Sequence, residues 1–270
     1  MEDSSLPPAP PDVPVHVYEG FAIPIPQMLL TGGGPDTFDA IAAAHLANIE
    51  RFIGLRPDLS VLEIGCGIGR DAIPLTRRLS AAGSYMGLDI IGPSIDWCQR
   101  NITARHPNFR FVFFDVKDQL HNPGGTMNAL DVRVPLASGT VDLIILQSVF
   151  THLLRPAIRH YLEEFRRLLE PAGRVYATMF IVNDSILAKA RATNLTPFNL
   201  TFQHELDPGC RINDPVYPTG GVAYTAGALD EMLEGADLRL ARPLLKGGWS
   251  GYYLDPDDGQ DVAVLAPGRD

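Results

Sequence analysis

The chain has 270 residues, 46% of them hydrophobic, and a formal net charge of −10. Its length suits one sizeable domain with extensions. The negative charge disfavours nucleic acid as a partner, because a protein that neutralises many phosphates needs a basic face. No apolar run reaches the roughly 18 residues that a membrane span requires.

The chain also lacks the usual sequence signals of secretion and of metal binding. It begins with the acidic stretch 1–5 instead of the basic start and apolar run of a signal peptide. The three cysteines, Cys66, Cys98 and Cys210, are too widely spaced for a zinc or iron–sulfur pattern. We therefore expect a cytoplasmic protein with reduced thiols and no metal site. The sequence leaves the oligomeric state open.

The N-terminal part divides into an arm and a helix. Residues 1–36 are rich in proline and are predicted to be extended or irregular, not helical. Apolar residues then recur at helical spacing, which predicts a helix that Asp36 or Thr37 caps and that continues to about Phe52. We take residues 1–54 as an N-terminal arm and helix, and residues 55–270 as the main domain.

From Val61 onward, predicted strands alternate with predicted helices. The strands cover Val61–Ile64, Tyr85–Asp89, Phe109–Phe114, Val141–Gln147 and Arg174–Ile181. The helices between them cover Asp71–Ala81, Pro93–Ala104 and Pro156–Leu169. This alternation predicts an α/β fold with a doubly wound, mostly parallel sheet. In such sheets ligands bind at the carboxyl ends of the strands.

The alternation stops after the fifth strand. Residues 183–222 show little periodicity and contain four prolines, so we expect a long substrate-lid insertion without regular structure. Aromatic residues in and near this segment, such as Phe198, Phe202 and Trp249, could line a pocket or hold the N-terminal arm. A helix over Thr225–Leu233 follows. Strands over Leu238–Leu245 and Asp261–Leu265 then complete seven strands.

A glycine-rich turn connects the first strand of the alternation to its helix. Gly65, Gly67 and Gly69 allow positive φ angles and a close approach of a ligand to the backbone. Free N–H groups at the helix start can face a polar ligand. A dinucleotide site needs G-x-G-x-x-G, whose last glycine is replaced by Arg70 here. This register disfavours NAD.

The turn Glu63-Ile-Gly-Cys-Gly-Ile-Gly69 resembles the E/D-x-G-x-G-x-G form of class I S-adenosylmethionine-dependent methyltransferases. The stretch 141–152 is similar to that family's fourth strand, and 161–174 is similar to its following helix, Pro-x-Gly turn and fifth strand. The resemblance covers roughly residues 55–182. It implies the Rossmann-like methyltransferase fold and S-adenosylmethionine as cofactor.

The resemblance also implies roles for individual residues. Asp89, at the end of the second strand, would accept hydrogen bonds from both ribose hydroxyls, and Ile90 would lie against the adenine. Asp115 would accept a hydrogen bond from the adenine amino group, the backbone N–H of Val116 would complete recognition of the adenine, and Glu63 would face the methionine amine. Gln147 would contact the cofactor at the end of the fourth strand, close to the methyl group.

Several methyltransferase chemistries are disfavoured. The sequence 146–150 is not the N/D-P-P-Y/F motif of DNA and protein-amide enzymes, and no cysteine has the Pro-Cys context of cytosine C5 enzymes. The paired glutamates of arginine methyltransferases and the acidic spacing of magnesium-dependent catechol enzymes are also missing.

A hydroxyl acceptor needs a base, and His152 after the fourth strand is the first candidate because imidazole titrates near neutrality. His204, in the insertion, is the second. We expect methyl transfer to a small molecule, at oxygen, for instance to a secondary metabolite. A sugar, glycan or other larger acceptor is an alternative. A cofactor-binding protein that keeps the fold without methyl transfer is another.

Overall fold

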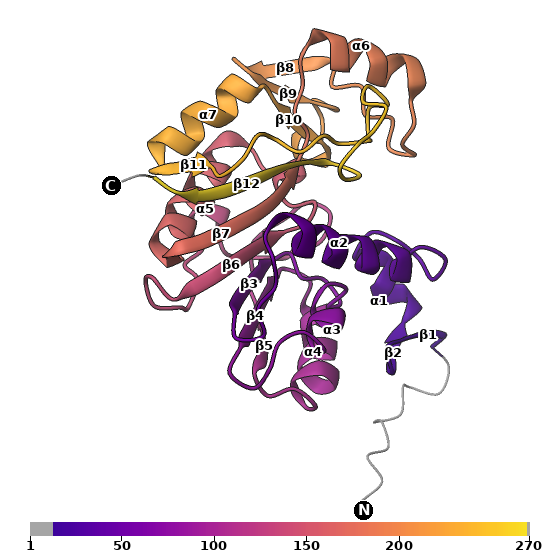
Figure 1. Cartoon of the computed structure of the whole chain (residues 1–270). Coiled ribbons are helices and arrows are strands. Elements are labelled where there is room, and N and C mark those ends of the chain that lie inside the picture. Colours follow the sequence, from indigo (N-terminus) through magenta and orange to yellow (C-terminus); the bar gives the residue numbers. More distant parts are fainter. Residues whose placement is uncertain (1–12, 269–270) are drawn as a thin grey trace, which may run out of the picture. The chain divides into compact units, whose positions relative to one another are not determined.

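The computed structural model describes residues 13–268, so the proline-rich stretch 1–12 of the predicted arm lies outside the described residues. The chain forms two compact units, residues 1–128 and 129–270. In Figure 1 the first unit runs from indigo to magenta and the second continues to yellow. Each unit is described by itself.

The first unit opens with a β-hairpin. Strands β1 (Val15–Tyr18) and β2 (Phe21–Pro24) are antiparallel, and both turn residues, Glu19 and Gly20, have positive φ. Such a two-residue turn matches the twist of the flanking strands. Helix α1 (Ile25–Leu30) follows, so the prediction that residues 1–36 contain no helix is wrong over this range. Pro26 lies in the first turn of α1, where its missing N–H costs nothing.

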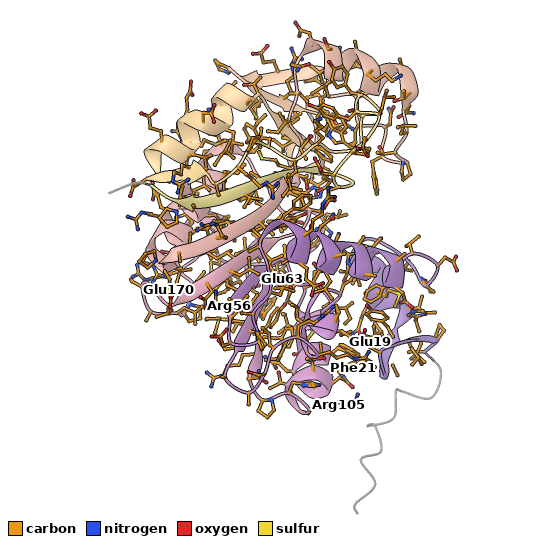
Figure 2. The ribbon with its side chains drawn as sticks, in the orientation of Figure 1. Glu19, Phe21, Arg56, Glu63, Arg105 and Glu170 are labelled. Atoms are coloured by element: carbon orange, nitrogen blue, oxygen red, sulfur yellow. The ribbon has the colours of Figure 1, made fainter. Side chains whose placement is uncertain are left out.

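The hairpin is fixed to the rest of the first unit through Phe21. This ring is buried beside Trp97, and the guanidinium carbon of Arg105 lies 4.6 Å from the ring centroid. Arg105 also donates from Nη1 to the carbonyl of Gly20 at 3.0 Å. Figure 2 shows the Phe21 and Arg105 labels together at this corner of the unit. The described part of the N-terminal arm is therefore packed structure.

Helix α2 (Phe38–Phe52) confirms the predicted helix, with Thr37 preceding its first residue. It buries Phe38, Ala42 and Ile49, the positions at helical spacing. Strands β3 (Ser60–Ile64), β4 (Ser84–Asp89) and β5 (Phe109–Phe113) follow, and they pair in parallel in that order.

The helices between these strands differ in part from the prediction. Helix α3 covers only Ala72–Leu75, instead of Asp71–Ala81. Beyond it the backbone bonds are mixed: the bond from Arg78 N to Leu75 O spans three residues, whereas the bond from Leu79 N to Leu75 O spans four, so regular helix does not continue. Helix α4 (Gly92–Cys98) continues as the π-helix η1 (Gln99–Thr103). Together the two elements correspond to the helix predicted at Pro93–Ala104.

The second unit contains the remaining strands of the main sheet. Strands β6 (Val141–Leu146) and β7 (Leu169–Met179) are parallel, and β12 (Asp261–Pro267) is antiparallel to β7. Strand β11 (Leu238–Leu240) pairs with β12 and is shorter than the predicted Leu238–Leu245. Pro243 interrupts that stretch, because proline cannot donate to a strand ladder.

Two helices of the second unit confirm their predictions. Helix α5 (Arg155–Leu168) precedes β7, and helix α7 (Ala226–Gly235) precedes β11. The Oγ1 of Thr225 accepts from the N–H of Ala228 and caps α7. Short 3-10 helices lie at η2 (Ala129–Asp131) and η3 (Phe150–His152).

The insertion is folded, which overturns the prediction of a structureless segment over 183–222. It contains helix α6 (Asp184–Thr193), the short 3-10 helix η4 (Pro218–Gly220) and a three-stranded antiparallel sheet. The strands of that sheet are β8 (His204–Asp207), β9 (Cys210–Ile212) and β10 (Val222–Tyr224). Each strand has only three or four residues, too few for a visible alternation.

A separate hydrophobic cluster supports the insertion. Phe202 and Trp249 are buried in it with Phe180 and the apolar face of α6. These two aromatic rings therefore pack in a hydrophobic core of the second unit, whereas Phe198 is 73% exposed.

The architecture is α/β, with the seven strands of the predicted mostly parallel sheet. β3, β4, β5, β6 and β7 have parallel partners, and β11 and β12 are antiparallel. Within the described part of the chain, we find no helix with the length and apolar character that crossing a membrane requires.

Candidate cofactor site

The glycine turn adopts the backbone that its sequence predicts. Gly65, Gly67 and Gly69 have φ of 77°, 53° and 80°, in the region that side chains disfavour. The N–H groups of Gly65 and Cys66 donate to the carbonyl of Leu88 on β4, at 2.8 and 3.1 Å. The turn is thereby held against the end of β4.

Asp89, the last residue of β4, fixes the same turn with its side chain. Its Oδ2 accepts from the N–H of Gly67 at 2.6 Å, and its Oδ1 accepts from the N–H of Ile91 at 2.8 Å. The side chain is buried, and burial raises the pKa of this carboxyl, although these backbone donors oppose the rise. A carboxylate has about four acceptor positions, so Asp89 keeps capacity for further donors such as ribose hydroxyls.

Glu63 lies on β3 (Figure 2). Its side chain is buried, with 2% of it exposed. Its Oε2 accepts a hydrogen bond from the hydroxyl of Tyr85 on β4. Burial raises the pKa of Glu63, and the nearby Asp71 carboxylate raises it further. Glu63, which is predicted to contact the methionine amine, thus already has Tyr85 as a hydrogen-bond partner. The sequence reasoning missed Tyr85, because register between strands decides which side chains meet.

Two residues at the glycine turn hold the N-terminal arm. The N–H of Ile68 donates to Oγ1 of Thr31 at 3.0 Å, and Arg70 donates from Nη1 to the carbonyl of Gly32 at 2.6 Å. A Cβ at Gly67 would lie 2.5 Å from Oγ1 of Thr31. The absence of a side chain at Gly67 is therefore needed for this contact as well as for the φ angle.

Asp115 and Val116 follow β5 in a compact loop that spans residues 115–127. Asp115 accepts from Nδ2 of Asn122 at 3.0 Å and from Oγ1 of Thr126 at 2.7 Å, and these hydrogen bonds lower its pKa. Val116 is buried and bridges to Met127. The carboxylate of Asp115 thus stabilises its own loop, and its predicted role toward the adenine stays a prediction. Ile90 is partly exposed directly after β4.

The remaining predicted site residues belong to the second unit. Gln147 follows β6 and is 7% exposed, with its Nε2 buried and without a partner. His152 is exposed at the end of η3 and bonds through Nδ1 to the carbonyl of Thr219 at 2.8 Å. His204 is exposed on β8 of the insertion sheet, in a different element from His152. In the described residues, no group of three or more His, Cys, Asp or Glu could hold a metal ion.

A family profile and curated proteins match the central part of the chain. Residues 61–173 match the sequence profile of the family described as "Methyltransferase domain". The chain is 32% identical over 102 residues to the probable cobalt-precorrin-6B C(15)-methyltransferase (decarboxylating) of Thermoplasma acidophilum, covering 37% of this chain and 48% of that protein. The chain spans about half the length, or less, of the first curated relatives that it matches.

Solved structures share the fold. A SAM-dependent methyltransferase from Aquifex aeolicus aligns with a TM-score of 0.51 at 16% identity, covering 89% of this chain and 97% of that one. The mitomycin 7-O-methyltransferase MmcR aligns with a TM-score of 0.53 at 13% identity, covering 87% of this chain and 55% of that one.

The fold and the glycine turn define an α/β protein of the Rossmann-like methyltransferase class. Residues 61–173 are the part of the chain that matches the methyltransferase domain family. S-adenosylmethionine is the cofactor that the resemblance of the glycine turn implies. The first unit fits it, because the turn at Gly67 is free of side chains and the buried carboxylate of Asp89 has unused acceptor positions.

Proposed function

We propose that the protein transfers the methyl group of S-adenosylmethionine to a hydroxyl of a small molecule, such as a secondary metabolite. The observation that carries this proposal is the glycine turn whose backbone N–H at Gly67 is bound to the buried carboxylate of Asp89. A carboxylate already fixed by two backbone donors is preorganised, so the ribose hydroxyls can add to it without rearranging the turn.

The cofactor supplies a methyl group activated by a sulfonium charge. The acceptor oxygen forms a bond to the methyl carbon, the carbon–sulfur bond breaks toward sulfur, and the hydroxyl proton must leave. His152 is the proposed destination of that proton. Its Nδ1 donates to the carbonyl of Thr219, which in the neutral ring leaves the lone pair on Nε2. This hydrogen bond supports the choice of His152 over His204, which lies on a strand of the insertion sheet.

Calorimetry with S-adenosylhomocysteine and with NAD tests the cofactor part of the proposal. We expect binding of the first and none of the second. Asp89→Ala should weaken S-adenosylhomocysteine binding by about 2 kcal/mol, roughly 30-fold, because a charged hydrogen-bond acceptor is lost. Asp96→Asn, a change at an exposed aspartate of α4, should leave the affinity unchanged. Equal affinities for wild type and Asp89→Ala would remove Asp89 from the site.

Methyl transfer from radiolabelled cofactor to a panel of phenols, small alcohols and sugars tests the acceptor part. His152→Ala should lower turnover by about 10²-fold or more with nearly unchanged S-adenosylhomocysteine affinity. Loss of affinity with unchanged turnover per bound cofactor would make His152 a structural residue. Transfer only to oligosaccharides would favour the glycan alternative, and cofactor binding without transfer to any acceptor would favour a binding protein.

A further inference from the structure

Ser148, directly after β6, is held in a strained backbone conformation by polar contacts. Its φ is 59°, which is unusual for a residue with a side chain. Its N–H donates to Oγ1 of Thr178 at 2.6 Å, and its Oγ lies 3.2 Å from Oγ1 of Thr151. The amide Nε2 of Gln260, over a hundred residues later, donates to the same Oγ at 3.0 Å. All of these residues belong to the second unit.

The two glutamines beside Ser148 each have a buried atom without a hydrogen-bond partner. Gln147 is its chain neighbour, and Nε2 of this side chain is an unpaired donor. Gln260 is bonded to it, and Oε1 of Gln260 is an unpaired acceptor. A buried polar atom without a partner is unfavourable. Both atoms have almost no accessible surface, although Gln260 as a whole is only partly buried.

We propose that Gln147 and Gln260, positioned by Ser148, bind a neutral hydroxyl of the methyl acceptor. This hydroxyl is not the one whose proton His152 receives: its oxygen accepts from Nε2 of Gln147, and its hydrogen donates to Oε1 of Gln260. This assignment rests on the proposed methyl transfer. It assigns Gln147 to the acceptor, whereas the sequence resemblance assigns Gln147 to the cofactor.

The uncharged surroundings of Ser148 favour a neutral ligand group over a charged one. The described partners of Ser148 are the hydroxyl groups of Thr151 and Thr178 and the amide of Gln260. The neighbouring carboxylate of Asp261 is used elsewhere, because Oδ2 accepts from Trp249 Nε1 at 2.7 Å and Oδ1 accepts from Gly247 N at 2.9 Å. A carboxylate ligand would oppose Oε1 of Gln260, and an ammonium would oppose the Nε2 donor of Gln147.

Nuclear magnetic resonance on the full chain loaded with S-adenosylhomocysteine tests the inference. The probes are phenol, benzoate and benzylamine, which share one ring and differ in the polar group. Phenol should shift the side-chain amide signals of Gln147 and Gln260, with an affinity at least tenfold higher than either charged probe. Equal affinities for the three probes, or signals that no probe shifts, would overturn the proposal.

Matched variants separate the acceptor role from a cofactor role. Gln147→Glu and Gln260→Leu should weaken phenol binding at least fivefold, because each removes the group assigned to the hydroxyl, and Gln147→Glu should also strengthen benzylamine binding. Gln203→Glu and Gln203→Leu, the same changes at an exposed residue of the insertion, should alter neither affinity. Should Gln147→Glu fail to fold, Gln260→Leu alone decides the outcome for the pair.

Cofactor affinity distinguishes the failure of this inference from failure of the proposed function. If wild type binds S-adenosylhomocysteine but Gln147→Glu binds it tenfold more weakly, Gln147 is a cofactor residue and the inference is wrong, whereas the proposed function stands. If wild type does not bind S-adenosylhomocysteine, both the inference and the proposed function are wrong. A cofactor-bound crystal soaked with phenol that shows only a water between the two amides would also overturn it.

Discussion

At the scale of single residues, acidic side chains at the ends of β4 and β5 have different local tasks. Asp89 fixes the glycine turn. Asp115 fixes its own loop, and Asp118 accepts from the N–H groups of Leu120 and His121 at 3.0 and 2.7 Å. The sequence shows where the acids stand along the chain, but the number of donors that each one satisfies depends on the folded loop.

The pair Asp118–His121 makes stability depend on pH. Oδ1 of Asp118 lies 3.1 Å from Nδ1 of His121, which lowers the pKa of Asp118 to about 2 and raises that of His121. The lowered pKa contributes stability above the unfolded value of about 4, which is lost as pH falls toward 2. The raised histidine pKa contributes stability below about 6.5, which is lost as pH rises through the folded value.

Asp118→Asn should therefore lower the free energy of unfolding near pH 5.5 by about 0.5–1 kcal/mol, and by less at pH 8.5. The amide oxygen can still accept the two backbone bonds, so the substitution removes mainly the charge. Urea unfolding at both pH values measures the difference. The same loss at both pH values would show that the pair contributes no charge interaction.

At the scale of elements, the turn between β3 and α3 depends on the segment after α1. Thr31 and Gly32 contact the turn through Ile68 and Arg70. This contact lies inside the first unit, and it indicates that the arm helps to shape the cofactor site. That the arm closes over the bound cofactor stays a proposal.

Gly67→Ala should destabilise the protein by about 1–2 kcal/mol from the left-handed backbone alone. The contact of the new Cβ with Thr31 adds to this loss, and S-adenosylhomocysteine affinity should fall at least tenfold. Thermal unfolding and calorimetry measure the two effects. Gly124→Ala, which meets nothing within 4 Å, is the control. An unchanged affinity in Gly67→Ala would mean that the turn does not approach the cofactor.

At the scale of the whole molecule, the second unit adds a folded insertion with its own core. Phe202 is fully buried in that core, and its ring centroid lies 5.6 Å from that of Trp249. A packed core of this kind predicts that the insertion contributes to stability, so any lid movement must occur without opening it.

Phe202→Ala should lower the free energy of unfolding by about 3–5 kcal/mol, the usual loss for a large buried ring. Phe198→Ala, at a side chain that is 73% exposed, should change it by less than about 0.5 kcal/mol. Urea unfolding followed by tryptophan fluorescence compares the two, because Trp249 reports on the same core. Equal effects of the two substitutions would show that the insertion core does not stabilise the protein.

The sequence by itself determined the α/β class, the strands from β3 to β7 and the glycine turn with Asp89. These features depend on local patterns: apolar periodicity, positive-φ glycines and an acid at a strand end. The folded insertion and the hairpin with α1 escaped prediction, because strands of three or four residues show no periodicity and a proline in the first helical turn looks like a break.

Only the tertiary structure decided which groups meet. It paired Glu63 with Tyr85 and placed Thr31 on the turn at Gly67. It also joined Gln260 to Ser148, more than a hundred residues apart, and left two buried amide atoms unpaired. Sequence patterns report on neighbours along the chain, whereas hydrogen bonds and burial between distant residues depend on strand register and packing.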